Sequence, residues 1–311
     1  MTEFFQQLIN GLSLGAVYAL LALGYTMVYG ILRFINFAHS DVFMVGAFVG
    51  YYAATPFTMN LFGRHVPVNL HLGDQSIVSG LIVMVLSMVL CAFLGILIER
   101  FAYRPLREGS KLTVLITAIG VSLLLESGGQ VIFGADPKPF PQLFPVKEFT
   151  AQGLSISSNQ LLIIGVSAVL LIALQFIVLK TKLGTAMRAV SFNHQAASLV
   201  GINNDLIISF TFGLGSALAA AGGILFALKD PSIQPYMGIL PGLKAFVAAV
   251  LGGIGNIPGA ALGGLVLGLI ETFVNGSRFS TYTDAIAFAV LILILLFRPA
   301  GLLGKLQVEK V

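Results

Sequence analysis

Long apolar runs separated by short polar segments dominate the chain. A helix needs about 20 mostly apolar residues to cross the roughly 30 Å hydrocarbon core of a membrane. Because six runs approach this length, the pattern predicts six clear membrane-spanning helices. These runs are Phe4–Leu32, Ile77–Ile98, Leu112–Phe133, Gln160–Leu179, Leu206–Leu228 and Thr281–Phe297.

Two further apolar regions are interrupted. Val42–Phe57 is short and follows the polar stretch Asn36–Asp41, whereas Leu243–Val274 is long but contains a glycine- and proline-rich break at Gly252–Gly259. Such a break ends one helix and allows a tight reversal. We therefore predict an all-α, polytopic membrane protein with eight or nine membrane-crossing or re-entrant helices.

The same pattern indicates the domain organisation. All the apolar runs belong to one transmembrane domain that occupies residues 1–311. A spanning helix followed by a polar break and a short helix occurs in both halves of the chain. Interrupted helices at corresponding places in two halves are a signature of transport pathways. We therefore predict a loose internal repeat of residues 1–133 and 160–297.

The composition excludes other protein classes. The chain has 311 residues, of which 57% are hydrophobic and 10% are charged, whereas soluble domains have about 25% charged residues. So few charges cannot cover a globular surface, and so much apolar surface does not stay disordered. Strands of a membrane β-barrel would alternate apolar and polar residues, and these runs do not alternate.

The basic residues indicate orientation. Lysine and arginine gather in Glu99–Lys111, in Lys180–Asp205 and in the tail that carries Arg298, Lys305 and Lys310. Because cytoplasmic loops of membrane proteins carry an excess of these residues, we expect all three segments inside. The loops at 58–76 and 134–159 are then outside, as is the N-terminus if Val42–Phe57 spans fully. The net charge of +4 therefore reflects basic loops that orient the chain in membrane lipid, and we expect no nucleic-acid partner.

No catalytic site, cofactor site or metal site is predicted. The stretch Gly11–Gly15 matches the G-x-S-x-G pattern of hydrolases, but it lies within an apolar helix, where its two glycines favour close helix packing. The four histidines form no H-E-x-x-H motif, and the single cysteine provides no thiolate cluster.

Five polar or charged residues at or near membrane depth are candidates for a translocation pathway. A carboxylate within a membrane is costly and faces the interior of the bundle or a water-filled path. Such residues line a substrate path, carry protons or bond to a neighbouring helix, and the pattern leaves these roles open. The candidates are Asn36, His39, Asp41, Glu126 and Glu271.

The loop Lys180–Asp205 contains a candidate docking element. Asn193 is a good helix N-cap and Gly201 a good terminator, so we predict a short helix over His194–Val200. An apolar face on such a helix fits a groove in a partner protein, and the alternative is a helix that rests on lipid headgroups. The predicted docking segment comprises Asn193, His194, Gln195, Ala196, Ala197, Ser198, Leu199, Val200 and Gly201, with the apolar face on Ala196, Ala197, Leu199 and Val200.

Three motifs, in order along the chain, resemble the permease subunits of branched-chain amino acid ABC importers of the LivH type. The first is Gly11–Asp41, with Asn36-Phe37-Ala38-His39. The second is Met187-Arg188-Ala189, followed by Ala196-Ala197 and Gly201-Ile202. The third is Ala248–Leu262, with its Gly-Gly-Ile-Gly and Pro-Gly-Ala stretches. The similarity covers essentially the whole chain.

The resemblance implies a type II-like ABC importer permease in the inner membrane of a bacterial cell. Its implied partners are a second, related permease, two cytoplasmic ABC ATPases and a periplasmic amino-acid-binding protein that delivers leucine, isoleucine or valine. ATP hydrolysis is then expected on the partner ATPases and not on this chain. The docking helix carried over from the family is Asn193–Gly201.

Two alternatives remain open at this level. The first is a related ABC permease for sugars or other small polar solutes. The second is an ion-coupled secondary carrier, in which Glu126 and Glu271 would bind the coupling ion.

Overall fold

The computed structural model describes residues 2–61, 64–68, 70, 72–107, 109–151, 153–298 and 300–304. Lys305 and Lys310 of the basic tail lie outside the described residues. In the part that is described, seven helices are long and apolar enough to cross a membrane. They are α1 (Thr2–Leu32), α3 (Ile77–Ile98), α4 (Lys111–Phe133), α5 (Ser158–Lys180), α8 (Asn204–Lys229), α10 (Ile257–Asn275) and α11 (Thr283–Phe297), the last preceded by a 3-10 turn at Ser280–Tyr282.

Two shorter helices, α2 (His39–Ala54) and α9 (Ile239–Gly252), bring the helices of the described bundle to nine, within the predicted range. The predicted break of the long apolar region near Gly252–Gly259 is confirmed, because α9 ends at Gly252 and α10 begins at Ile257. Local capping explains this restart. The Asn256 side chain accepts a hydrogen bond from the Gly259 backbone N–H at 3.1 Å, and Pro258 lies in the first turn, where its missing N–H costs nothing.

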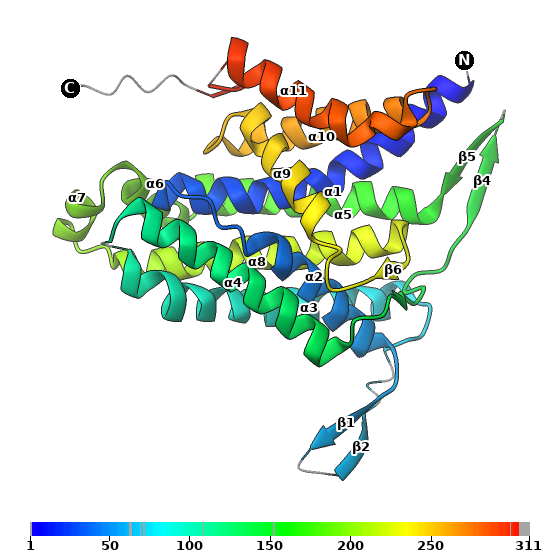
Figure 1. Ribbon diagram of the computed structural model, residues 1–311, viewed down its shortest axis with the longest axis horizontal. Coiled ribbons are helices and arrows are strands. Elements are labelled where there is room, and N and C mark those ends of the chain that lie inside the picture. The colour runs from blue at the N-terminus through cyan, green and yellow to red at the C-terminus, as the bar shows by residue number, and fades with distance from the viewer. Residues whose placement is uncertain are drawn as a thin grey trace.

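The helices lie along the long axis of the molecule, with different connections at its two ends (Figure 1). One end carries the loop helices α6 (Lys182–Phe192) and α7 (His194–Leu199), and we call it the basic end. The other carries the N-terminus and the antiparallel hairpin of β4 (Glu148–Ala151) and β5 (Leu154–Ser157), and we call it the hairpin end.

The loops at the hairpin end contain strands that the apolar pattern did not predict. A second antiparallel hairpin pairs β1 (Phe57–Leu61) with β2 (Arg64–Val68). A two-residue pairing joins β3 (Lys138–Pro139) to β6 (Ser232–Ile233) and so connects the two loops that carry them.

The structure confirms that the basic segments gather at one end. Arg104 and Arg107 form ion pairs with Asp205 across the two loops. The start of the tail lies at the same end, because the backbone N–H groups of Leu302 and Leu303 donate to carbonyls at the end of α9. The N-terminus lies at the opposite end, where Gln6 bonds to Ser155 of β5.

Helix α1 forms the centre of the bundle, and nearly all of its second half is buried. It packs closely on α10, where a Cβ atom added at Gly268 would lie 2.3 Å from the backbone nitrogen of Gly15. The predicted close packing of Gly11 and Gly15 is therefore confirmed. By contrast, α4, α5 and α11 expose long apolar faces, as expected for helices in contact with lipid or with another membrane subunit.

The two short helices begin next to each other inside the bundle. His39 at the start of α2 packs against Gly24, which lies about 12 Å before the end of α1 at 1.5 Å per residue. Ser40 of α2 touches Gly238 and Gly242 at the start of α9. From this point α2 runs toward the hairpin end and α9 toward the basic end (Figure 1). With 16 and 14 residues, the two helices are shorter than a full membrane span, and they diverge from a point inside the bundle.

Candidate functional site

The basic loop between α5 and α8 folds into the short helices α6 and α7. The side chain of Asn193 accepts a hydrogen bond from the Ala196 backbone N–H at 3.0 Å, so the predicted N-cap of α7 is present. Gly201 has φ of +86°, the left-handed conformation in which glycine ends helices. Helix α7 stops at Leu199, one residue before the predicted end, because Val200 already leaves the helical conformation as the chain turns into Gly201.

The apolar surface of this loop differs from the predicted one. Ala197 is buried and holds α7 against the bundle, so it does not belong to the outer face. Leu199 and Val200 are 87% and 76% exposed, and Phe192 at the end of α6 is 92% exposed. We call Phe192, Leu199 and Val200 the coupling surface. Phe192 was not among the predicted residues because α6 was not predicted, although the capping residue Thr181 marks the start of that helix.

The remaining residues of the predicted docking segment are polar or small. His194, Gln195, Ala196 and Ser198 are exposed. The backbone of His194 accepts a hydrogen bond from the side chain of Asn204 at 2.8 Å, which ties α7 to the first residue of α8. On the other side, the Ser191 hydroxyl donates to the Gly30 carbonyl and ties α6 to α1. The loop is therefore attached to two buried helices of the bundle.

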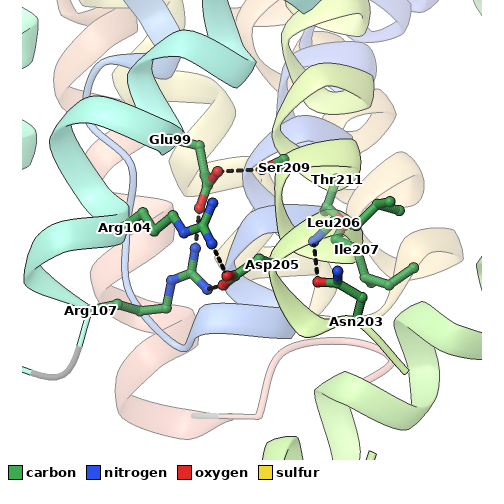
Figure 2. Close-up of polar contacts among 9 residues, drawn as sticks. All are labelled: Glu99, Arg104, Arg107, Asn203, Asp205, Leu206, Ile207, Ser209 and Thr211. Atoms are coloured by element: carbon green, nitrogen blue, oxygen red, sulfur yellow. Dashed lines mark hydrogen bonds and ion pairs between the residues drawn. The ribbon is translucent and has the colours of Figure 1, made fainter. Parts of the chain in front are cut away.

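An ion cluster beside this loop links α8 to α3 (Figure 2). Arg107 donates to Asp205 at 2.9 Å and also to Glu99, while Arg104 donates to Asp205. Glu99 accepts a further hydrogen bond from Ser209 on α8. Because Glu99 is fully buried, its charge has to be compensated within the protein. We call Glu99, Arg104, Arg107 and Asp205 the ion cluster.

The ion cluster was not among the predicted site residues. Sequence analysis read Arg104 and Arg107 only as orientation signals, since their acidic partner Asp205 lies about 100 residues away. The available signal was Glu99, an acidic residue that directly follows an apolar run. In the structure Glu99 begins a π-helical turn, Glu99–Tyr103, that continues α3, and such turns are frequent at functional sites.

Four of the five candidate pathway residues lie around the start of α2. The Asn36 side chain accepts a hydrogen bond from the Tyr103 hydroxyl at 2.6 Å, and His39 packs edge-on against Tyr25, with ring centroids 4.7 Å apart. Asp41 accepts a hydrogen bond from Ser122 of α4 at 2.5 Å. Glu126 follows Ser122 by one helical turn and is half-buried.

Glu271, the fifth candidate, lies elsewhere. It is bound by Lys244 of α9 at 2.7 Å and by the Tyr18 hydroxyl at 2.9 Å. Lys244 also contacts Asp284 of α11 at 2.7 Å. These contacts join four helices, α1, α9, α10 and α11, and satisfy the buried carboxylate. Glu271 therefore has the contacts of a structural ion pair.

Residues 7–295 match the family described as the permease component of the branched-chain amino acid transport system. The high-affinity branched-chain amino acid transport system permease protein BraD of Pseudomonas aeruginosa is 42% identical over 99% of this chain and 98% of its own length. The corresponding protein LivH of Escherichia coli is 40% identical with the same coverage.

A second group of relatives matches a smaller part. The ribose import permease protein RbsC of Haemophilus influenzae is 31% identical over 38% of this chain and 39% of its own length. No solved structure gives a significant match.

Proposed function

Because the chain belongs to the branched-chain amino acid transport permease family, we propose that it is the membrane permease of an ATP-driven importer for leucine, isoleucine and valine. The observation that carries this proposal is similarity over 99% of the chain to permeases named for these substrates. The similarity to a ribose permease covers only 38% of the chain. The proposal places the protein in the inner membrane of a bacterial cell.

The proposed assembly contains this chain, a second related permease, two cytoplasmic ABC ATPases and a periplasmic binding protein. ATP hydrolysis belongs to the ATPases. This subunit converts their movement into alternate opening of a pathway. The full-length relatives are named as permeases of transport systems, which supports such a division of labour.

An ATPase docks on the coupling surface in this proposal. Three large apolar side chains, Phe192, Leu199 and Val200, stand exposed at the basic end, where they would meet water unless another protein covers them. A compact helix with apolar anchors fits a groove in a partner. Helix α7 is short and stiff, because Asn193 caps its first turn and the buried Ala197 packs it against the bundle. A movement of the ATPase would therefore be transmitted through α7 with little deformation of the helix.

The movement then passes from α7 into the bundle by two routes. One route is the bond from Asn204 to the His194 backbone at the start of α8. The other is the ion cluster, in which Asp205 of α8 and Glu99, directly after α3, share Arg107 (Figure 2). Helices α3 and α8, which pack along each other, would therefore tilt as a unit.

The translocation pathway runs past the junction of α2 and α9. Interrupted helices that begin inside the bundle are typical of substrate sites in transporters. Asp41 lies at this junction, and Glu126 follows its hydrogen-bond partner Ser122 by one helical turn; carboxylates there would suit the ammonium group of an amino acid. Glu126 points from a largely exposed helix, and a carboxylate in that position needs water or another protein around it.

The first experiment tests whether an ATPase docks on the coupling surface. Leu199→Asp and Val200→Asp place charges on the coupling surface, and Leu183→Asp places the same charge on a half-exposed site of α6. We expect the first two variants to lose the ATPase subunits during affinity purification, while the control retains them. ATPases that stay bound to both coupling-surface variants would contradict the docking proposal.

The substrate is tested separately, by uptake of radiolabelled leucine and ribose in cells that lack their own transporters for both. The importer is expressed with its binding protein and ATPases. We expect ATP-dependent uptake of leucine that unlabelled isoleucine or valine inhibits. Uptake of ribose alone, or leucine uptake that follows an ion gradient without ATP, would overturn the proposed function.

A further inference from the structure

A cavity of about 800 Å³ opens at the basic end of the bundle. Its walls come from the ends of α1, α5, α9 and α11, from α6 and from the start of α10. This volume is within the range of small-molecule binding sites. The cavity does not include the coupling surface, the ion cluster or the residues around the start of α2.

The polar side of the cavity is positively charged. Arg33 and Arg188 line it, together with Ser191 and with Asn256, the N-cap of α10. Among the described residues that line the cavity there is no aspartate or glutamate. The N-terminus of a 19-residue helix adds a partial positive charge at the same place. These groups would attract an anion.

The two arginines are held in position by their surroundings. Arg188 donates to the carbonyl of Val178 at the end of α5 and to the Thr185 hydroxyl at 3.3 Å. A guanidinium group has five N–H donors, so these contacts orient it and leave others for a ligand. Arg33 directly follows α1 and has φ of +58°, a conformation that favours glycine, and an arginine at this position brings a cation to the cavity wall.

Apolar side chains line much of the rest of the cavity, and some of them are also exposed on the outside of the bundle. Phe246 and Val250 of α9 form its inner part. Leu179 of α5 and Leu295 of α11 line it as well, although they are 50% and 44% exposed. The cavity thus combines cations with an apolar wall that includes exposed side chains of α5 and α11.

We propose that this cavity binds an anionic phospholipid from the leaflet at the basic end. The lipid phosphate lies between Arg33 and Arg188, and the first carbons of an acyl chain lie against Phe246 and Leu295. Arginine is well suited to phosphate because its donors form paired, charge-assisted hydrogen bonds, and basic pockets between membrane helices bind lipid headgroups. A free phosphate ion would use the arginines but not the apolar wall.

The position of the site gives the lipid a mechanical consequence. Arg188 belongs to α6, which leads directly into α7, while Arg33 follows α1 and Asn256 precedes α10. A phosphate bound among them would hold α6, and with it α7, to α1 and α10.

The test measures the thermal stability of the purified full-length protein in detergent after lipid removal. Phosphatidylglycerol, phosphatidylcholine and inorganic phosphate are added separately. We expect phosphatidylglycerol to raise the Tm at lower concentration than phosphatidylcholine, and inorganic phosphate to have no effect. Equal effects of the two lipids would overturn the anionic preference, and a full effect of inorganic phosphate would overturn the lipid as the source of the phosphate.

Variants then locate the site. We expect Arg33→Gln and Arg188→Gln each to raise, by roughly fivefold, the phosphatidylglycerol concentration that is needed to increase the Tm. Lys182→Gln, which removes a charge from an exposed position on the same helix as Arg188, leaves it unchanged. Full lipid stabilisation of both arginine variants would overturn the proposal.

A second pair of variants leaves all charges in place. Leu295→Trp fills the apolar wall, whereas Leu296→Trp adds the same side chain at the neighbouring residue, which is 71% exposed and lies outside the cavity lining. We expect only Leu295→Trp to weaken the lipid effect. Equal behaviour of the two tryptophan variants would overturn the placement of the acyl chain.

Discussion

At the scale of single residues, two carboxylates within the membrane illustrate two different environments. Glu271 is buried and paired with Lys244 at 2.7 Å, with the Tyr18 hydroxyl as a second donor. Glu126 is half-buried on a helix that is mostly exposed. Sequence analysis left both residues with the same set of roles, since position within an apolar run is all that the chain shows. The contacts separate them, because the paired carboxylate of Glu271 is satisfied within the protein, whereas the half-buried Glu126 needs further polar surroundings.

The Lys244–Glu271 pair leads to a stability prediction. Lys244→Met leaves the buried Glu271 without its cation, and loss of one partner from a buried pair costs about 3–5 kcal/mol. We expect a clear fall in the Tm of the purified protein in detergent. The double variant Lys244→Met/Glu271→Gln removes the charge as well and recovers part of the loss. A single variant as stable as the original protein would show that the pair contributes nothing.

At the scale of helices, the sequence predicted the capping residues correctly, but it did not predict which helices contact each other. Asn193 and Gly201 bracket α7 as predicted, and the break before α10 lies where the glycines and proline predicted it. Such signals act within a few residues, so the chain displays them directly. Helix α2, by contrast, begins at His39 and not at Val42, because tertiary packing against Gly24 buries His39 and allows this polar residue to start the helix.

The contact between α1 and α10 can be tested with one pair of glycines. A Cβ atom at Gly268 would lie 2.3 Å from backbone atoms of Gly15, whereas one at Gly120 of α4 would meet nothing within 4 Å. We expect Gly268→Val to separate the two helices, because backbone atoms cannot move aside as a side chain does. The substitution should lower the free energy of unfolding by roughly 3 kcal/mol, the upper range for overpacking. Gly120→Val serves as the control.

The measurement is again the Tm of each purified variant, with membrane insertion checked by its presence in the membrane fraction. Gly268→Val should insert and melt at lower temperature, and Gly120→Val should melt near the original protein. If the two variants melt at the same temperature, close packing of α1 on α10 does not stabilise the bundle.

At the scale of the whole molecule, the separation of charge predicts how the protein sits in the membrane. Arg104, Arg107 and Arg188 lie at one end, and the N-terminus and the β4–β5 hairpin lie at the other (Figure 1). Since positively charged loops stay in the cytoplasm, the basic end faces inward. The coupling surface and the lipid-binding cavity then lie on the cytoplasmic side, and the hairpins face the periplasm.

Cysteine labelling tests this orientation. The single cysteine, Cys91, is buried, so Cys91→Ala provides a background without thiols. In spheroplasts, a thiol reagent that does not cross membranes should label Thr150→Cys on the β4–β5 hairpin. It should label Gln195→Cys on α7 only after the membrane is permeabilised. The reverse pattern would contradict the orientation.

The internal repeat of residues 1–133 and 160–297 stays a prediction at this scale. Both halves contain a long helix, an irregular segment and a short helix, namely α1 with α2 and α8 with α9. The two short helices run in opposite directions from a shared origin.

The sequence by itself determined the class of the protein, its spanning helices and the short helix α7 in the loop between α5 and α8. These properties depend on length, composition and capping, which act over neighbouring residues. Only the tertiary structure decided which helix faces meet. The outer helices are apolar almost all round, and in lipid such a helix has no preferred face to bury, so sequence periodicity does not orient it. The partners of Glu99 and Glu271, the shared origin of α2 and α9 and the cavity at Arg33 and Arg188 all join segments that are far apart in the chain. They exist because helix packing brings those segments to the same depth.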